Sequence, residues 1–201
     1  FAPNHPKEVA DWCRAAEDCG FERVGLVDSQ SIYREVYVCC TAGLQATKSI
    51  KIGPRVTNAL TRHPSVTASA LATMVELAPG RVFAGVGTGD SALINIGMRP
   101  IKLGPLGQFV TCLRALMRGE RVLYQGVELG LSWSGADIPI YVSAHGPKTV
   151  EFSGQYAGGV SYGDGVGKAI GNDALACVAA GAGGAGRSAA CAASSSCNSS
   201  S

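Results

Sequence analysis

The sequence lacks any hydrophobic run that approaches the ~20 apolar residues needed to cross a bilayer. Charge is also sparse: charged residues make up 16% of the 201 residues, the net charge is +2, and the lysines and arginines are scattered. This pattern offers no basic face to a nucleic acid or to an anionic membrane. The start, 1–6, has no basic and apolar regions like those of a signal peptide. We therefore expect a cytoplasmic protein with neither kind of partner.

Metal-ligand patterns are missing as well. The three histidines have no HExxH spacing and the eight cysteines form no CxxC pair, so we expect no metal site. Most of the cysteines lie inside apolar segments of a chain of ordinary domain size. We interpret them as small buried hydrophobic residues rather than as a disulfide framework.

Helix-like and strand-like segments alternate over much of the chain, which predicts βαβ units with a parallel sheet. Helices are expected at Pro6–Ala16, Ile32–Ala46, Ser65–Leu77, Pro105–Met117 and Pro147–Tyr156. Strands are expected at Phe21–Val27, Ile50–Asn58, Arg81–Gly87, Ile138–Ser143 and Gly159–Gly163. The fold class predicted from this alternation is α/β.

Two stretches break the alternation. Residues 120–137 are polar and aromatic without a clear period, and we expect an excursion there. Residues 177–201 consist almost entirely of small side chains, with too little apolar bulk to offset the entropy cost of ordering. We therefore expect one main domain over 1–176 and a tail over 177–201, and we base no functional argument on residues beyond about 173.

Glycines and polar side chains gather after the predicted strands. The segments concerned are Val27–Ser31, Gly53–Asn58 with Thr61–Pro64, Gly85–Ala92 and Tyr141–Thr149. Because loops that follow the carboxyl ends of parallel strands meet at one end of the sheet, we expect these segments to converge there.

The glycine-rich segment begins like a dinucleotide-binding fingerprint, with Gly85, Gly87 and Gly89 at alternate positions. No glycine completes the fingerprint, and no acidic residue follows about 20 positions later, so we reject a Rossmann fold. We expect the glycines to let a flat ring system approach the backbone, with Thr88 and Asp90 as polar contacts. A turn that merely needs positive φ angles is the alternative.

Taken together and in this order, the four segments resemble the luciferase-like monooxygenase superfamily, in particular its branch of F420-dependent, methylenetetrahydromethanopterin-reductase-like enzymes. The resemblance implies a (β/α)8 TIM barrel. Such a barrel takes ~250 residues, so we expect an incomplete one, with the first strand ahead of Phe1 and the last strands missing or unreadable.

The resemblance also implies where a deazaflavin would bind. A non-prolyl cis peptide between Arg55 and Val56 would back its central ring, and the loop after the Ile138–Ser143 strand would hold its phosphate region beside free helix amides. The implied cofactor contacts are Arg55, Val56, Thr57, Gly87, Thr88, Gly89, Ser143, Ala144, His145, Gly146 and Lys148.

Two positions depart from the family. Arg55 stands where Gly or Ser is usual, and Ser29 stands where histidine is common. With no histidine there to carry a proton, the candidate catalytic acids or bases are Asp28 and Asp90, which match the family's acidic positions. Structural roles stay open: Asp90 as a helix N-cap, His63 at a helix start, and Lys148 as a solvated lysine.

The predicted function is hydride transfer between coenzyme F420 and a small organic substrate, by an enzyme that resemblance suggests is a homodimer. The closest alternative is a reduced-FMN-dependent monooxygenase on the same fold. A TIM-barrel hydrolase without a redox cofactor is a third possibility, because barrels support many chemistries. A cofactor-binding protein that has lost turnover is a fourth.

Overall fold

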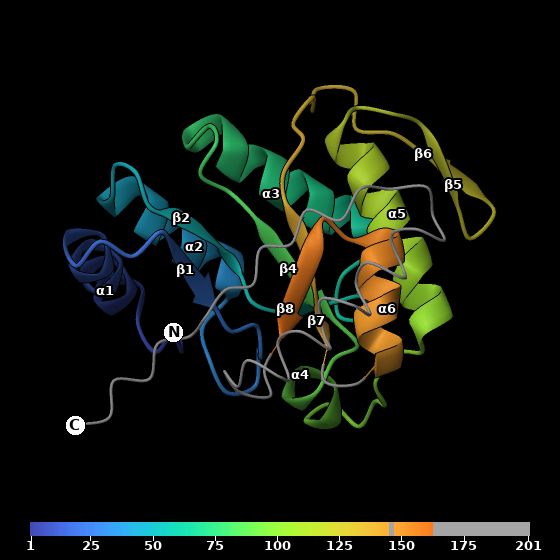
Figure 1. Cartoon of the computed structure of the whole chain (residues 1–201), viewed down its shortest axis with the longest axis horizontal. Coiled ribbons are helices and arrows are strands. Elements are labelled where there is room, and N and C mark those ends of the chain that lie inside the picture. Colours follow the sequence, from blue (N-terminus) through green and yellow to red (C-terminus); the bar gives the residue numbers. More distant parts are fainter. Residues whose placement is uncertain (145–146, 163–201) are drawn as a thin grey trace. The chain divides into compact units, whose positions relative to one another are not determined.

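Strands and helices alternate along the chain of the computed structural model, which describes residues 1–144 and 147–162 (Figure 1). The chain divides into two compact units, Phe1–Ile140 and a second that begins at Tyr141. The first unit contains α1 (Pro6–Asp18), β1 (Arg23–Leu26), α2 (Val36–Ala46), β2 (Lys51–Pro54), β3 (Thr57–Asn58), α3 (Pro64–Leu77), β4 (Ala84–Gly87), α4 (Ser91–Ile94), α5 (Leu103–Met117), β5 (Val122–Tyr124) and β6 (Val127–Leu129). Strand β7 (Ile140–Ala144) starts at the boundary, and α6 (Pro147–Tyr156) and β8 (Gly159–Tyr162) follow.

The strands that flank a helix pair in parallel, as the alternation predicts. Strand β1 pairs with β2 from Arg23 opposite Lys51, and β3 pairs with β4 from Thr57 opposite Val86. In the second unit β7 pairs in parallel with β8. The carboxyl ends of β1 and β2, and those of β3 and β4, therefore lie side by side.

Proline and histidine define two helix starts. His5 accepts a hydrogen bond from the Lys7 amide at the start of α1, and His63 accepts one from the Ser65 amide at the start of α3. A proline follows each histidine, at a position where the missing N–H costs nothing. Helix α1 buries the predicted stripe of Val9, Cys13 and Ala16 and packs against α2.

The second helix begins later than predicted, at Val36 instead of Ile32. Glu35 is its N-cap and accepts a hydrogen bond from the Val38 amide at 2.8 Å. The preceding residues form a turn in which the amides of Ile32 and Tyr33 donate to the Ser29 carbonyl. A side-chain cap thus outweighs the apolar residues ahead of it.

The predicted strands are longer than the observed ones. The expected Phe21–Val27 strand shrinks to Arg23–Leu26, and Phe21 is 58% exposed rather than buried. The expected Ile50–Asn58 strand is interrupted at residues 55–56 and becomes β2 and β3. Ahead of β4, only an isolated bridge between Ile52 and Val82 extends the pairing.

The stretch at 120–137 contains an antiparallel hairpin of β5 and β6. Its two-residue turn places Gln125 at φ 50° and Gly126 at φ 82°, which is the backbone that favours tight hairpins. The predicted tail over 177–201 lies outside the described residues.

Buried cysteines contribute to the core of the first unit. Cys13, Cys39, Cys40 and Cys112 are buried, Cys19 is exposed, and all five are free thiols.

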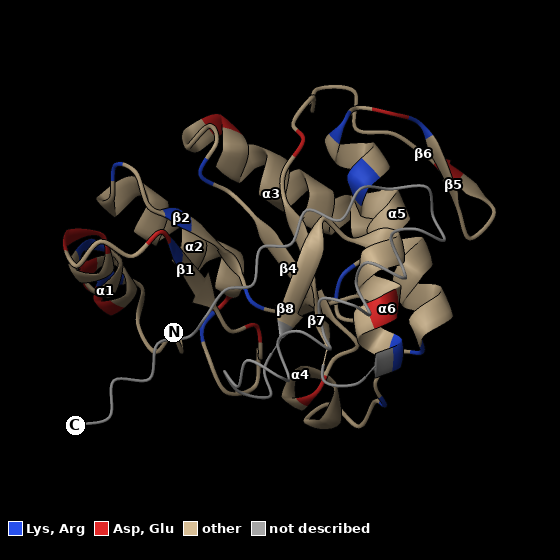
Figure 2. Ribbon diagram, viewed as in Figure 1, with Lys and Arg blue, Asp and Glu red and all other residues tan. Residues whose placement is uncertain are grey.

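Within the described ranges no helix is both long and apolar enough to span a membrane. In the same ranges, no group of His, Cys, Asp and Glu side chains lies close enough together to hold a metal ion. Basic and acidic residues are interspersed along these elements, and β4, β7 and β8 carry neither (Figure 2).

Candidate functional site

Three strand-end segments of the first unit are joined by side-chain hydrogen bonds. Thr57 lies in β3, and Asp28 follows β1. The Thr57 hydroxyl donates a hydrogen bond to Oδ2 of Asp28 at 2.7 Å. Ser91 and Ser29 are joined through their hydroxyls at 2.9 Å, and Gln30 Nε2 donates to the Ala92 carbonyl at 2.7 Å. The loops after β1, β3 and β4 therefore converge, as the parallel alternation predicts.

The peptide bond between Arg55 and Val56 is cis, which confirms the geometry that the family resemblance implies. It lies between β2 and β3, and the Arg55 amide donates to the Leu26 carbonyl at 2.6 Å. Gly85 packs against this segment: a Cβ there would lie 2.9 Å from the Pro54 carbonyl oxygen and 3.1 Å from Val56 Cγ1. Glycine at 85 thus keeps β4 close to residues 54–56.

The Arg55 side chain lies over Gly25, where an added Cβ would be 2.6 Å from Arg55 Cβ. It lines a cavity of about 310 Å³ with Phe1, Phe21 and Val27. Arg55 is not part of the lining of a second cavity, which lies beside Asp28.

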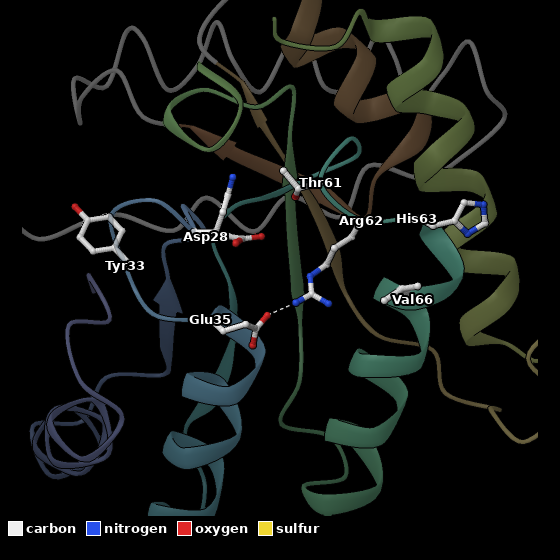
Figure 3. A pocket seen from close by; sticks show the side chains of 8 residues that line it. Asp28, Tyr33, Glu35, Thr61, Arg62, His63 and Val66 are labelled. Atoms are coloured by element: carbon white, nitrogen blue, oxygen red, sulfur yellow. Dashed lines mark hydrogen bonds and ion pairs between the residues drawn. The ribbon is translucent and has the colours of Figure 1, made fainter. Parts of the chain in front are cut away.

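A cavity of about 460 Å³ lies beside Asp28, at the first turns of α2 and α3 (Figure 3). Its lining includes Asp28, Tyr33, Glu35, Thr61, Arg62 and His63. Carboxylates, a guanidinium and hydroxyls therefore face a space large enough for a small organic molecule.

Arg62 is held in place on two sides. Its guanidinium forms an ion pair with Glu35, which bridges α2 and α3 in Figure 3, and lies 4.7 Å from the centre of the Tyr37 ring. The side chains of Arg62 and Glu35 are 28% and 41% exposed, so solvent screens the pair. The pair fixes the orientation of charged groups at the cavity more than it stabilises the fold.

Burial raises the pKa of the Asp28 carboxyl above its ordinary value. The hydrogen bond from Thr57 and the positive charge of Arg62 act in the opposite direction, and the negative charge of Glu35 adds to the rise. Desolvation is the largest of these influences. Asp28 is therefore more easily protonated than a solvated aspartate, which is a property of a proton-transfer group.

The turn after β4 has a glycine where the backbone requires one. Gly89 has φ 89°, and a Cβ there would overlap the Leu93 side chain, so turn geometry and packing account for this glycine. Asp90 occupies the N-cap position of α4, but its side chain makes no cap hydrogen bond and is exposed. Its carboxylate is thus not engaged as a cap, and a catalytic role for Asp90 stays a prediction.

In the second unit, Ser143 and Ala144 end β7 and pair in register with Ser161 and Tyr162 of β8. Ala144 is fully buried, Ser143 is half-buried, and Lys148 is exposed in the first turn of α6. His145 and Gly146 lie outside the described residues. Phosphate binding by this loop stays a prediction.

Sequence reasoning missed the polar wall made by Gln30, Tyr33, Glu35 and Arg62. One signal was available for Glu35, because an acidic residue directly before an apolar run is a typical helix start.

His63 was named with two possible roles, one at the site and one at a helix start. Its Nδ1 interacts with the Ser65 amide and hydroxyl at the start of α3, and its ring packs edge-on against Tyr124 at 5.4 Å. The helix-start role is therefore confirmed, although His63 also lines the cavity.

Comparison with known proteins identifies relatives that are about 30% identical to this chain. The 5,10-methylenetetrahydromethanopterin reductase of Methanolobus tindarius is 32% identical over 168 residues, which cover 80% of this chain and 51% of the relative. The F420-dependent glucose-6-phosphate dehydrogenase of Nakamurella multipartita is 31% identical over 173 residues, with 77% and 51% covered. The chain thus spans about half the length of these curated relatives.

The fold agrees with these matches. The solved structure of the coenzyme F420-dependent tetrahydromethanopterin reductase from Methanopyrus kandleri superposes with a TM-score of 0.80 at 26% identity, covering 94% of this chain and 61% of that chain. This confirms the predicted α/β barrel and that the chain corresponds to part of one. The family model for the luciferase-like monooxygenase matches residues 2–199, and the chain belongs to this family.

Proposed function

We propose that the protein is an F420-dependent oxidoreductase that transfers a hydride between the deazaflavin and a small organic substrate. The observation that carries the proposal is the Asp28–Thr57 pair beside a cavity of about 460 Å³, where the strand-end loops meet. The names of the relatives support the choice of cofactor, because both reductases and dehydrogenases among them are F420-dependent enzymes.

The residues at the strand ends fit a flat heteroaromatic ring. Gly85 brings the β4 backbone against residues 54–56, and the half-exposed Val56 provides an apolar surface there. Thr88 adds a half-buried hydroxyl at the end of β4. We assign ring contacts to Arg55, Val56, Thr57, Gly87, Thr88 and Gly89. In the second unit, we assign phosphate contacts to Ser143, Ala144, His145, Gly146 and Lys148.

When bound, F420 would supply or accept a hydride at C5 of its ring. The chain's own contribution is orientation and one proton-transfer group. Asp28 suits that role because burial favours its protonated form and because it lines the cavity. Asp90 is the second candidate. A homodimer in the cytoplasm is part of the same proposal and rests on the resemblance and the composition.

The test is cofactor binding followed by turnover. Fluorescence titration of the purified protein should show F420 binding at least ~10-fold tighter than FMN binding. Reduced F420 with 5,10-methylenetetrahydromethanopterin, and F420 with glucose 6-phosphate, are the first substrate pairs to assay at the F420 absorbance band. Asp28→Asn should lower kcat by about 10²-fold or more, in the range of general acid–base catalysis, while F420 still binds.

Glu22→Gln is the matched control for Asp28→Asn, because Glu22 is an exposed carboxylate just ahead of the same strand. It should leave binding and turnover unchanged. Tight FMN binding without F420 binding would replace the proposal with a reduced-FMN-dependent monooxygenase. Hydrolytic activity without any redox cofactor would replace it with a hydrolase, and F420 binding without hydride exchange would indicate a binding protein.

A further inference from the structure

The Thr57 hydroxyl has a fixed position. Thr57 is fully buried in β3, where it pairs with Val86 of β4, and its neighbour Asn58 is also buried. The Asn58 side chain closes the turn that follows: its Oδ1 accepts from the amides of Leu60 and Thr61 at 3.0 and 2.9 Å. The backbone on both sides of Thr57 is therefore held by the β3–β4 pairing and by this turn.

Asp28, in contrast, lies on the loop after β1 and depends on Thr57 for its orientation. The Thr57 hydroxyl donates to Oδ2 of Asp28 at 2.7 Å and is the only hydrogen-bond partner of that carboxyl among residues 1–144 and 147–162. A hydroxyl has a single hydrogen to donate, so this bond engages one carboxyl oxygen. The other oxygen has no such partner, and Asp28 lines the cavity.

The charged groups around Asp28 do not replace this bond. Arg62 attracts its carboxylate and Glu35 repels it, but these two residues are paired with each other. The buried Tyr37 phenol lies beside the hydroxyls of Thr57 and Thr67, and in the described part of the chain it makes no hydrogen bond to Asp28. Within this site, Thr57 is thus the group that can fix the direction of the Asp28 carboxyl.

We propose that Thr57 is a positioning residue for proton transfer: its hydroxyl fixes Oδ2 of Asp28 so that the second carboxyl oxygen is presented to substrate in the cavity. The catalytic consequence rests on the proposed function, whereas the effect on the Asp28 carboxyl does not. Removing the hydroxyl removes a hydrogen bond that favours ionised Asp28, so the pKa of Asp28 rises further.

The test uses three threonine variants and two measurements. Carbon-13 NMR of aspartate carboxyls, assigned with Asp28→Asn, follows the Asp28 titration in protein without cofactor. Thr57→Val should move the titration midpoint to higher pH, Thr57→Ser should restore it, and Thr47→Val should leave it unchanged. Thr47 is the control because it is also buried and its hydroxyl donates a hydrogen bond to the Gly43 carbonyl, at the end of α2 opposite to Glu35.

The second measurement is F420-dependent turnover. With Asp28 as a proton donor, kcat falls as the pH rises through the Asp28 pKa. Thr57→Val should therefore move this fall in kcat to higher pH. It should also lower kcat by about 5- to 10-fold, the effect of one lost hydrogen bond. If Thr57→Val does not fold, Thr57→Ala replaces it in both measurements.

The outcomes separate the two proposals. An Asp28 titration that Thr57→Val leaves unchanged overturns the positioning role, even if F420 turnover is found. If F420 neither binds nor reacts while the titration moves as expected, the proposed function fails and the contact between Thr57 and Asp28 stands. Equal loss of kcat in Thr57→Val and Thr47→Val, without a change in pH profile, would make the role of Thr57 purely structural.

Discussion

At the scale of single residues, Glu17 joins distant parts of the first unit. Its carboxylate, near the end of α1, accepts hydrogen bonds from the amides of Lys48, Ser49 and Ile50 and from the Ser49 hydroxyl, at 2.6–3.1 Å. These bonds lower the pKa of Glu17 from 4.5 to about 2, with the amides of Ile50 and Ser49 contributing most. The carboxylate thereby fixes the turn that leads into β2.

Glu17→Gln should therefore lower the free energy of unfolding at pH 7. Because the folded pKa is depressed, the contribution of Glu17 is complete above the unfolded pKa of 4.5 and is lost as the pH falls toward about 2. The difference between Glu17→Gln and the unmodified protein should shrink across this window in denaturant titrations. Glu22→Gln is the control for removing one exposed carboxylate. A constant difference between Glu17→Gln and the unmodified protein from pH 7 to pH 2.5 would contradict the assignment.

Residue types at the site could be predicted from the sequence, but their partners could not. Asp28 and Asp90 follow predicted strands and match acidic positions of the family, and Thr57 lies near the end of a predicted strand. The Thr57–Asp28 bond joins residues 29 apart, and its direction depends on side-chain rotamers that no sequence period encodes. The hydrogen bonds of Glu17 to the turn before β2 had no sequence signal, because a glutamate near a helix end is ordinary.

At the scale of elements, helices were predicted better than strands. Proline, histidine and glycine mark the ends of α1 and α3, whereas α2 begins where a glutamate side chain caps it. The strands are short and buried, so their apolar runs continue into neighbouring residues that do not pair. The interruption between β2 and β3 could be anticipated only from the family resemblance.

Gly85→Ala tests the close packing of β4 against residues 54–56. The added Cβ would meet the Pro54 carbonyl oxygen at 2.9 Å and Val56 Cγ1 at 3.1 Å, so the strands must separate. We expect a loss of ~1–3 kcal/mol in the free energy of unfolding, the range for overpacking, together with weaker cofactor binding.

Gly104→Ala is the control for Gly85→Ala, because Gly104 lies in α5 with nothing near its missing Cβ. It should stabilise the protein by up to ~1 kcal/mol through helix propensity. Equal denaturant midpoints for the two variants would show that β4 tolerates a side chain at 85 and would contradict the packing argument.

At the scale of the whole molecule, parallel strand pairing and membership in the family agree with the sequence-based prediction. The alternation of helices and strands was sufficient for the fold class, because strands that flank a helix pair in parallel. Composition also predicted the buried role of the cysteines, and among the described ones only Cys19 departs from it.

Thiol reactivity should report this burial directly. Burial raises the pKa of Cys13 and of Cys112 to about 11 and that of Cys40 well above its ordinary value. Iodoacetamide at pH 8, followed by peptide mapping, should modify Cys19 in the native protein and the other described cysteines only after unfolding. Cys19→Ser should remove the label from the peptide that contains residue 19, and rapid native labelling of Cys40 would contradict the core assignment.

The hydroxyl bond between Ser29 and Ser91 has a consequence for evolution. It joins two strand-end loops through residues 62 positions apart, and Ser29 is almost fully buried. A larger or apolar side chain at either position leaves the other hydroxyl without its partner, so the two substitutions are energetically coupled. Among relatives that have a serine at one of these positions, the other should covary with it, and relatives with a histidine at 29 should differ at residue 91.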